Sequence, residues 1–178
     1  MQLSVGQKVA YPNQGVCVVE EIKKRLFGER TISGYCLRVL GDNSTIFVPT
    51  DNAENVGIRP LISTAQCKKL VRELSNDFEP ACGDWKLRAK QFAEKLHSGC
   101  IFEAADVFKK LTYLSFEKKL SFREQTMLEK AKYLVVSEIT NADRREYGWL
   151  EGEICSLVQR ACAKHKQITT STFSATVH

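Results

Sequence analysis

The first 60 residues alternate short apolar runs with turn residues, which is the pattern of β-hairpins. The apolar runs occupy residues 8–11, 16–19, 35–40 and 45–48. The first two runs flank 12–15, where proline fixes φ and glycine permits a positive φ, and the last two flank a second turn at 41–43. Pro49 ends the last run because proline cannot donate to a strand ladder. We expect four to five short strands in a small antiparallel barrel, then a short helical turn at 51–55.

After residue 61 the apolar residues recur every three or four positions, the period of amphipathic helices. Five helices are predicted. Ser63, Asp84 and Asp143 are expected to cap the first, second and fifth helices, and Ser121 with Glu124 has the spacing of a capping box at the start of the fourth. The fourth helix is expected to run from residue 122 to about 141.

The change of period divides the chain into two expected domains. The first spans residues 1–61 and is all-β, and the second spans residues 62–178 and is all-α, so the fold class is α+β. Polar residues, proline and glycine at 75–83 mark a linker within the helical domain. The Thr- and Ser-rich tail after about residue 166 is expected to be flexible.

Composition describes a water-soluble protein with a mild positive charge. The 178 residues are 43% hydrophobic and 26% charged, with a net charge of +5. Residues 1–60 carry 7 basic and 6 acidic side chains, whereas residues 61–178 carry 19 and 15, so the helical domain is the better candidate for an anionic partner. The chain contains no apolar stretch long enough to cross a bilayer and no signal-peptide pattern at its start. We therefore expect a cytoplasmic protein with no membrane partner.

Catalytic and metal-binding signatures are absent from the sequence. The chain has 7 cysteines, but no C-x-x-C pair and no histidine cluster accompanies them, so reduced and mostly buried thiols are expected rather than a zinc site. Phosphate-binding loops, dinucleotide fingerprints, zinc-protease motifs and nucleophile elbows are all missing. The sequence therefore indicates a protein that is not an enzyme and needs no metal or cofactor.

The basic residues of the helical domain leave two interpretations open. One cluster lies on the predicted helix that starts at Trp85, and a second lies where the third helix meets the fourth. The clusters are Lys86, Arg88, Lys90 and Lys95, and Lys109, Lys110, Lys118, Lys119 and Arg123. Either cluster can be a solvated face or can bind phosphates. Trp85 can end the apolar stripe of its helix as a core residue, or it can be exposed and suited to stacking on a base.

Four segments together resemble the CarD family of bacterial transcription regulators. The segments are VGQKVAYPNQGVCVVEEI at 5–22, FVPTDNAENVGIRPL at 47–61, DWKLRAKQFAEKLHSG at 84–99 and LSFREQTMLEKAK at 120–132. The resemblance implies a Tudor-like barrel that docks on the β subunit of RNA polymerase. It also implies a helical domain that contacts promoter DNA in the minor groove at the upstream edge of the melted bubble. The implied activity is stabilisation of the open complex in transcription initiation.

The resemblance also implies roles for particular residues. Trp85 matches a tryptophan that wedges into the minor groove, and Lys86, Arg88 and Lys90 beside it complete the expected DNA-binding set. Arg25 matches a polymerase-contacting position. Phe47 stands where relatives commonly have an arginine that faces the polymerase, so it either supplies an apolar contact or is turned inward.

One rival interpretation of the same residues needs no DNA. The barrel is then a protein-recognition adaptor, the helices are a scaffold, Trp85 is buried and the lysines are merely solvated. The chain is expected to be a monomer, because one small bundle can use all the predicted apolar stripes.

Overall fold

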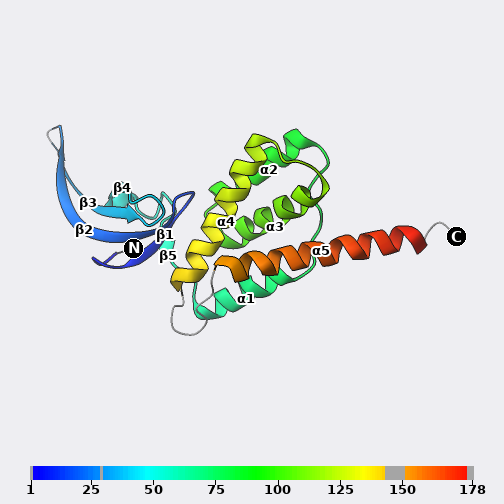
Figure 1. Cartoon of the computed structure of the whole chain (residues 1–178). Coiled ribbons are helices and arrows are strands. Elements are labelled where there is room, and N and C mark those ends of the chain that lie inside the picture. Colours follow the sequence, from blue (N-terminus) through cyan, green and yellow to red (C-terminus); the bar gives the residue numbers. More distant parts are fainter. Residues whose placement is uncertain (1, 29, 143–150, 176–178) are drawn as a thin grey trace.

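A computed structural model describes residues 2–28, 30–142 and 151–175, and shows an antiparallel sheet followed by a helical bundle (Figure 1). The strands are β1 Lys8–Tyr11, β2 Gly15–Phe27, β3 Arg30–Val39, β4 Thr45–Pro49 and β5 Arg59–Pro60. A 3₁₀ helix at Thr50–Asn52 follows β4. The helices are α1 Thr64–Ser75, α2 Trp85–His97, α3 Ile101–Glu117, α4 Phe122–Ala142 and α5 Glu151–Ala175. The α+β class expected from the sequence is confirmed.

The sheet has the strand order β4-β3-β2-β1-β5, and its neighbours are antiparallel. Both predicted turns are present: Gly15 adopts a φ of 85° after the first, and Asn43 a φ of 58° in the second. The middle strands are longer than the sequence pattern indicates, with 13 residues in β2 and 10 in β3. Their far ends form a hairpin that extends away from the helices (Figure 1).

A bulge in β2 decides which side chains face the β-domain core. Val19 lies opposite Leu37, and both are buried in that core. The register then shifts, so that Glu21 lies opposite Cys36 instead. Because side chains alternate along a strand, this extra residue turns Glu21, Lys23 and Arg25 to the outer face of the sheet.

The predicted helix starts are largely confirmed. Ser63 forms a capping box with Gln66, and Asp84 accepts hydrogen bonds from the first turn of α2. Ser121 and Glu124 form the expected reciprocal pair, in which Ser121 N–H donates to Glu124 and Glu124 N–H donates to Ser121 Oγ. The cap expected from Asp143 lies outside the described residues.

The segment after about residue 166, expected from the sequence to be a flexible tail, begins within a helix, and its flexibility stays a prediction. Helix α5 continues to Ala175, beyond the last turn that packs on the bundle (Figure 1). Threonine and serine lower helix propensity only modestly, and a helix already formed adds residues without a new nucleation cost. The helix therefore extends through this polar segment.

The cysteines are thiols of two kinds. Cys17, Cys36, Cys67 and Cys162 are buried as expected, whereas Cys82 and Cys100 are exposed and Cys155 is half-buried. Burial raises the pKa of Cys17 and of Cys162 to about 11, which keeps both thiols protonated and unreactive. Among the described residues, no group of three or more His, Cys, Asp or Glu side chains could hold a metal ion.

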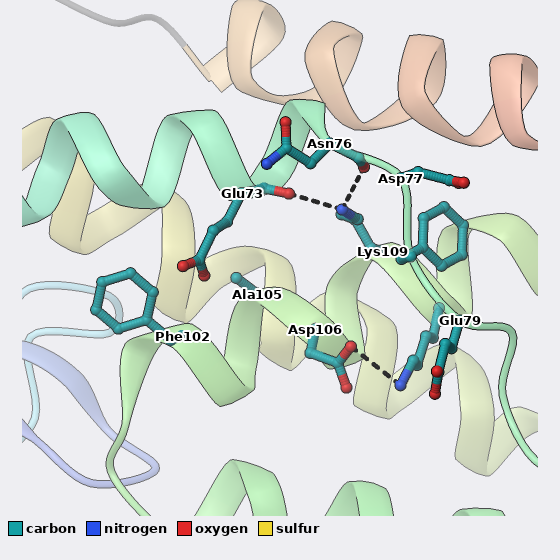
Figure 2. A pocket seen from close by; sticks show the side chains of 10 residues that line it. Glu73, Asn76, Asp77, Glu79, Phe102, Ala105, Asp106 and Lys109 are labelled. Carbon is teal, nitrogen blue, oxygen red and sulfur yellow. Dashed lines mark hydrogen bonds and ion pairs between the residues drawn. The ribbon is translucent and has the colours of Figure 1, made fainter.

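A buried lysine joins α1 to α3 beside a surface pocket of about 330 Å³ (Figure 2). Lys109 Nζ donates to the carbonyl oxygens of Glu73 at 2.6 Å and Asn76 at 2.7 Å, which lie at the C-terminal end of α1. Burial lowers the pKa of Lys109. Asp106 in the same pocket forms an ion pair with Lys110 at 3.0 Å. The charged groups of this pocket are therefore paired with other groups of the protein. They stabilise the packing of α1 on α3, and we do not take the pocket as the candidate site.

The two domains are joined by a buried ion pair. Arg59 of β5 donates from Nη1 to Glu138 Oε1 at 2.5 Å and from Nη2 to Oε2 at 2.9 Å, and Glu138 is only 3% exposed. Glu138 also accepts from the Ile62 N–H at 3.1 Å. Arg59 further donates to the carbonyl oxygen of Gly99, between α2 and α3. One arginine thus binds the sheet to two separate parts of the bundle.

Aromatic packing completes this interface. Tyr133 of α4 lies against the turns that contain Gly15 and Gly41, so closely that a β-carbon on Gly15 would stand 2.7 Å from the Tyr133 ring and one on Gly41 would overlap the hydroxyl. Both turns therefore require glycine.

Within the described residues, no helix is long and apolar enough to cross a membrane.

Glu138→Gln is expected to lower the free energy of unfolding by about 2 kcal/mol, because the half-buried Arg59 loses its ionic partner. Urea unfolding followed by circular dichroism measures the change. The matched control is Glu94→Gln, which removes an exposed contact with Lys90 at 3.9 Å and should change stability by no more than about 0.5 kcal/mol. Equal midpoints for the two variants would contradict the importance of the domain contact.

Candidate nucleic-acid interface

The candidate interface starts at the first turn of α2. The Asp84 carboxylate accepts from the N–H groups of Lys86 at 2.8 Å and Leu87 at 3.3 Å, which fixes the backbone around Trp85. The N-terminus of a helix carries a partial positive charge that favours anions. The Asp84 carboxylate caps that charge here, so this turn holds Trp85 at a fixed helix start.

Trp85 is exposed, which decides between the two interpretations of its helical spacing. Its exposed fraction is 63%, whereas Ala89, Phe92 and Leu96 of the same helix are buried in the bundle. Trp85 lies one turn before Ala89, and the neighbouring helices do not cover it. Lys86 Nζ lies 5.6 Å from the centre of the indole ring, which is a cation–π contact. The tryptophan is therefore a surface residue next to a cation.

Arg88 does not belong to the exposed set in which sequence reasoning placed it. Its exposed fraction is 3%, and Nη2 donates to Glu124 Oε1 at 2.7 Å. Nη1 donates to the carbonyl oxygens of Cys82 at 2.7 Å and Gly83 at 3.2 Å. The position lies on the face of α2 that meets α4, so its guanidinium fastens the linker before α2 to the start of α4. Arg88 supports the turn that carries Trp85.

Glu124 is the ionic centre of this junction. Its burial acts to raise the pKa, but hydrogen bonds from the Ser121 backbone, the Arg88 guanidinium and the Ser121 hydroxyl outweigh that effect, and the pKa falls to about 2. The carboxylate is therefore ionised at neutral pH, and its charge is matched within the protein.

A groove of about 580 Å³ lies between the starts of α2 and α4. Trp85 lines it together with three cationic side chains, Lys118, Lys119 and Arg123. Phe122 stands beside the groove, between two lining residues, and is 86% exposed. The sequence placed Lys118, Lys119 and Arg123 in a basic cluster but did not single out Phe122. A signal was available, because Phe122 does not share the helix face of Met127, Ala131 and Leu134.

Lys90 is exposed on α2, one turn beyond Lys86. Its Nζ lies 3.9 Å from Glu94, in an exposed contact of the kind that contributes little to stability. Lys90 therefore remains available at the surface next to the first turn.

The sheet brings together the two residues expected to contact the polymerase. The Arg25 guanidinium of β2 lies 4.7 Å from the centre of the Phe47 ring on β4. Between them Gly34 of β3 provides room for the ring, because a β-carbon there would overlap it. Phe47 is half-buried, and its neighbours Ile46 and Val48 pack on the β-domain core. Phe47 is thus turned outward, on the same face as Arg25.

Comparisons with known proteins match both domains. The family model described as "CarD-like/TRCF RID domain" matches residues 3–62, and the one described as "CarD, C-terminal domain" matches residues 69–148. The chain belongs to the CarD family. Both halves of the CarD arrangement are present in order, which makes the chain a protein of the transcription-regulator type.

Two relatives of this CarD-family chain illustrate the match. A Bacillus subtilis (strain 168) protein named "Putative transcription factor YdeB" is 28% identical over 135 residues, which cover 76% of this chain and 88% of that protein. The solution structure of the 72-residue N-terminal domain of Myxococcus xanthus CarD is 34% identical over 33% of this chain and 79% of that domain, with a TM-score of 0.29. Both family matches end before helix α5 begins at Glu151.

The lowered pKa of Glu124 predicts acid sensitivity. A folded-state pKa of about 2, below the ordinary glutamate value of 4.5, stabilises the fold above pH 4.5, and this stabilisation is lost as the pH falls toward 2. In Glu124→Gln we expect that part of the pH dependence, on the order of 3 kcal/mol, to be missing. Urea midpoints measured between pH 2 and pH 7 test this. The exposed Glu117→Gln serves as control, and a Glu124→Gln profile parallel to that of the wild type would refute the assignment.

Proposed function

We propose that this protein binds the β subunit of RNA polymerase through its β-domain and promoter DNA through the start of α2. In doing so it would stabilise the open complex at the upstream edge of the bubble. The observation that carries the proposal is the exposure of Trp85, at 63%, next to the Lys86 ammonium group at a helix start of a CarD-family helical domain. Exposing a large aromatic side chain to water is unfavourable in free energy, and a contact with nucleic acid would remove that exposure.

The DNA contact would use shape rather than base sequence. Trp85 is the wedge in the minor groove, and Lys86 and Lys90 lie near it to bind phosphates. Inserting an apolar wedge costs a few kcal/mol of lost base stacking, so it is favoured where the duplex is already opening. Arg88, which is buried on Glu124, would act by holding the wedge in position.

The polymerase contact would use the outer face and edge of the sheet. Arg25 and Phe47 form one compact surface, in which the ring supplies apolar area and the guanidinium supplies charge. Within the described residues β4 pairs only with β3, so its other edge can pair with a strand of a partner. Phe47 in place of an arginine lowers the ionic part of this contact, and the backbone pairing is unaffected.

The connection between the domains gives the proposal its mechanism. A protein that holds polymerase with one domain and DNA with the other stabilises their complex only if the two domains keep a defined separation. Arg59, Glu138 and Tyr133 supply the contacts that restrict this motion. Because the domains move little, the free energy of the polymerase contact also stabilises the contact with opened DNA. With freely moving domains, the entropy cost of ordering them would offset that free energy.

The salt dependence of binding distinguishes the adaptor interpretation from DNA binding. Phosphate contacts release counterions, so DNA binding must weaken as salt rises. A protein partner held by Trp85, Leu87 and Phe122 alone would bind through apolar area and depend little on salt. Salt-insensitive self-association with no DNA binding would support the adaptor.

Trp85→Ala is expected to abolish most of the increase in open-complex lifetime that the wild-type protein produces, because the wedge is removed while the exposed site tolerates alanine. The lifetime of a polymerase–promoter complex after competitor challenge measures this. Lys164→Ala, an exposed change on α5, should behave as wild type. If the wild type leaves the lifetime unchanged, the proposed function is wrong.

Arg25→Glu is expected to weaken binding to the polymerase β subunit by about tenfold, which corresponds to 1.4 kcal/mol. The change reverses the charge beside Phe47. Lys24→Glu makes the same change of charge on the opposite face of the same strand and is the matched control. Surface plasmon resonance measures both affinities, and equal effects would indicate long-range charge rather than a specific contact.

A further inference from the structure

The groove beside Trp85 has the size and lining of a binding site for a small planar group. Its volume of about 580 Å³ lies within the roughly 300–1,000 Å³ common for ligand sites. The apolar side chains of Ala89, Leu120 and Met127 line it, and each is less than one tenth exposed. The indole of Trp85 adds a large exposed aromatic surface. These features favour a flat, weakly polar occupant that can stack.

The charges of the groove favour an anionic chain attached to that occupant. Lys118, Lys119 and Arg123 contribute three cations to its lining. Of the described residues that line it, Glu124 is the one with a carboxylate, and that group is shared by Arg88 at 2.7 Å and Lys118 at 4.0 Å. The groove therefore has a surplus of positive charge beside an apolar surface.

We propose that this groove receives a single unpaired base of a melted DNA strand. The base stacks on Trp85 over the apolar lining, and Lys118, Lys119 and Arg123 bind the phosphates on either side of it. This inference rests on the proposed function and adds to it the part of the DNA that the site takes. A base within a duplex is stacked and paired and cannot enter, so the groove would distinguish melted DNA from paired DNA.

Other occupants use only part of the groove. An apolar side chain of a protein would cover Trp85 but leave the positive charges of Lys119 and Arg123 unmatched. A free phosphate would match the cations but leave the apolar lining unused. A nucleotide carries a planar ring and flanking phosphates on one chain, and so matches both features. Base stacking on aromatic side chains is tolerant of sequence, in keeping with a site that lacks a set of base-reading polar groups.

The test uses the full chain and a forked DNA duplex with 2-aminopurine at the first unpaired position. Binding is expected to change the 2-aminopurine fluorescence as the base moves from water onto the indole. Replacing that nucleotide by an abasic site should weaken binding by about tenfold, within the range for one stacked base. Trp85→Ala should remove the difference between the two DNAs, and Trp85→Phe should restore part of it.

Charge variants test the phosphate contacts separately. Lys119→Ala should weaken binding to the intact and the abasic fork alike and reduce the salt dependence by about one phosphate contact. Lys164→Ala on α5 is the matched control and should change neither. Urea midpoints equal to that of the wild type show that each variant is folded.

Two results would overturn the inference in different ways. Equal affinity for intact and abasic forks, with binding that still requires Trp85, means that the tryptophan acts only as a wedge in the duplex; the proposed function then stands and the base site does not. Failure of the folded wild type to bind any of the DNAs overturns both.

Discussion

The structure depends on one constraint, which is that two small domains must keep a fixed relation to each other. The Arg59–Glu138 ion pair imposes it. Burying a charged pair is costly, and a pair of this kind is favourable only when additional hydrogen bonds satisfy both groups. Those bonds are present, because Glu138 also accepts from the Ile62 backbone and Arg59 also donates to the carbonyl of Gly99. The geometry of the pair therefore determines where the sheet sits on the bundle.

The rest of the interface follows from that placement. With the sheet held on α4, the two hairpin turns meet the ring of Tyr133, and only glycine at positions 15 and 41 leaves room for it. Gly15 also shapes its turn with a φ of 85°, so at that position local conformation and domain packing select the same residue. Agreement of this kind between levels is what gives a sequence one stable fold.

Each candidate surface is set by an internal feature rather than by its own exposed residues. In the β-domain, the bulge after Val19 turns Arg25 outward to meet Phe47. In the helical domain, Arg88 and Glu124 join the start of α2 to the start of α4, and Trp85 stands on that support. In both places an internal feature of the fold sets the direction of the exposed residues, which is a strand bulge in one domain and a buried ion pair in the other. Arg88 itself is buried in this support, with an exposed fraction of 3%.

Local patterns in the sequence were enough to predict much of this protein. The turns after Tyr11 and around Asn43, the caps at Ser63 and Asp84 and the capping box at Ser121 are interactions between residues close in the chain, so spacing alone reveals them. The α+β class followed from the change of hydrophobic period near residue 61. The helical tail to Ala175 was missed because its polar composition suggests disorder, although an existing helix extends at little cost.

What the tertiary structure alone decided were the facts that depend on contacts between distant residues. Helical spacing left Trp85 either buried or exposed, and the packing of α2 in the bundle, which leaves Trp85 63% exposed, decided between the two. Alternation left Phe47 turned either in or out, and the packing of its neighbours Ile46 and Val48 on the β-domain core turned it outward. The burial of Arg88 and the groove bordered by Trp85 likewise arise where α2 meets α4, a junction that no local pattern describes. The sequence by itself determined the elements and their ends; packing between the elements determined which of its cationic and aromatic side chains face a partner.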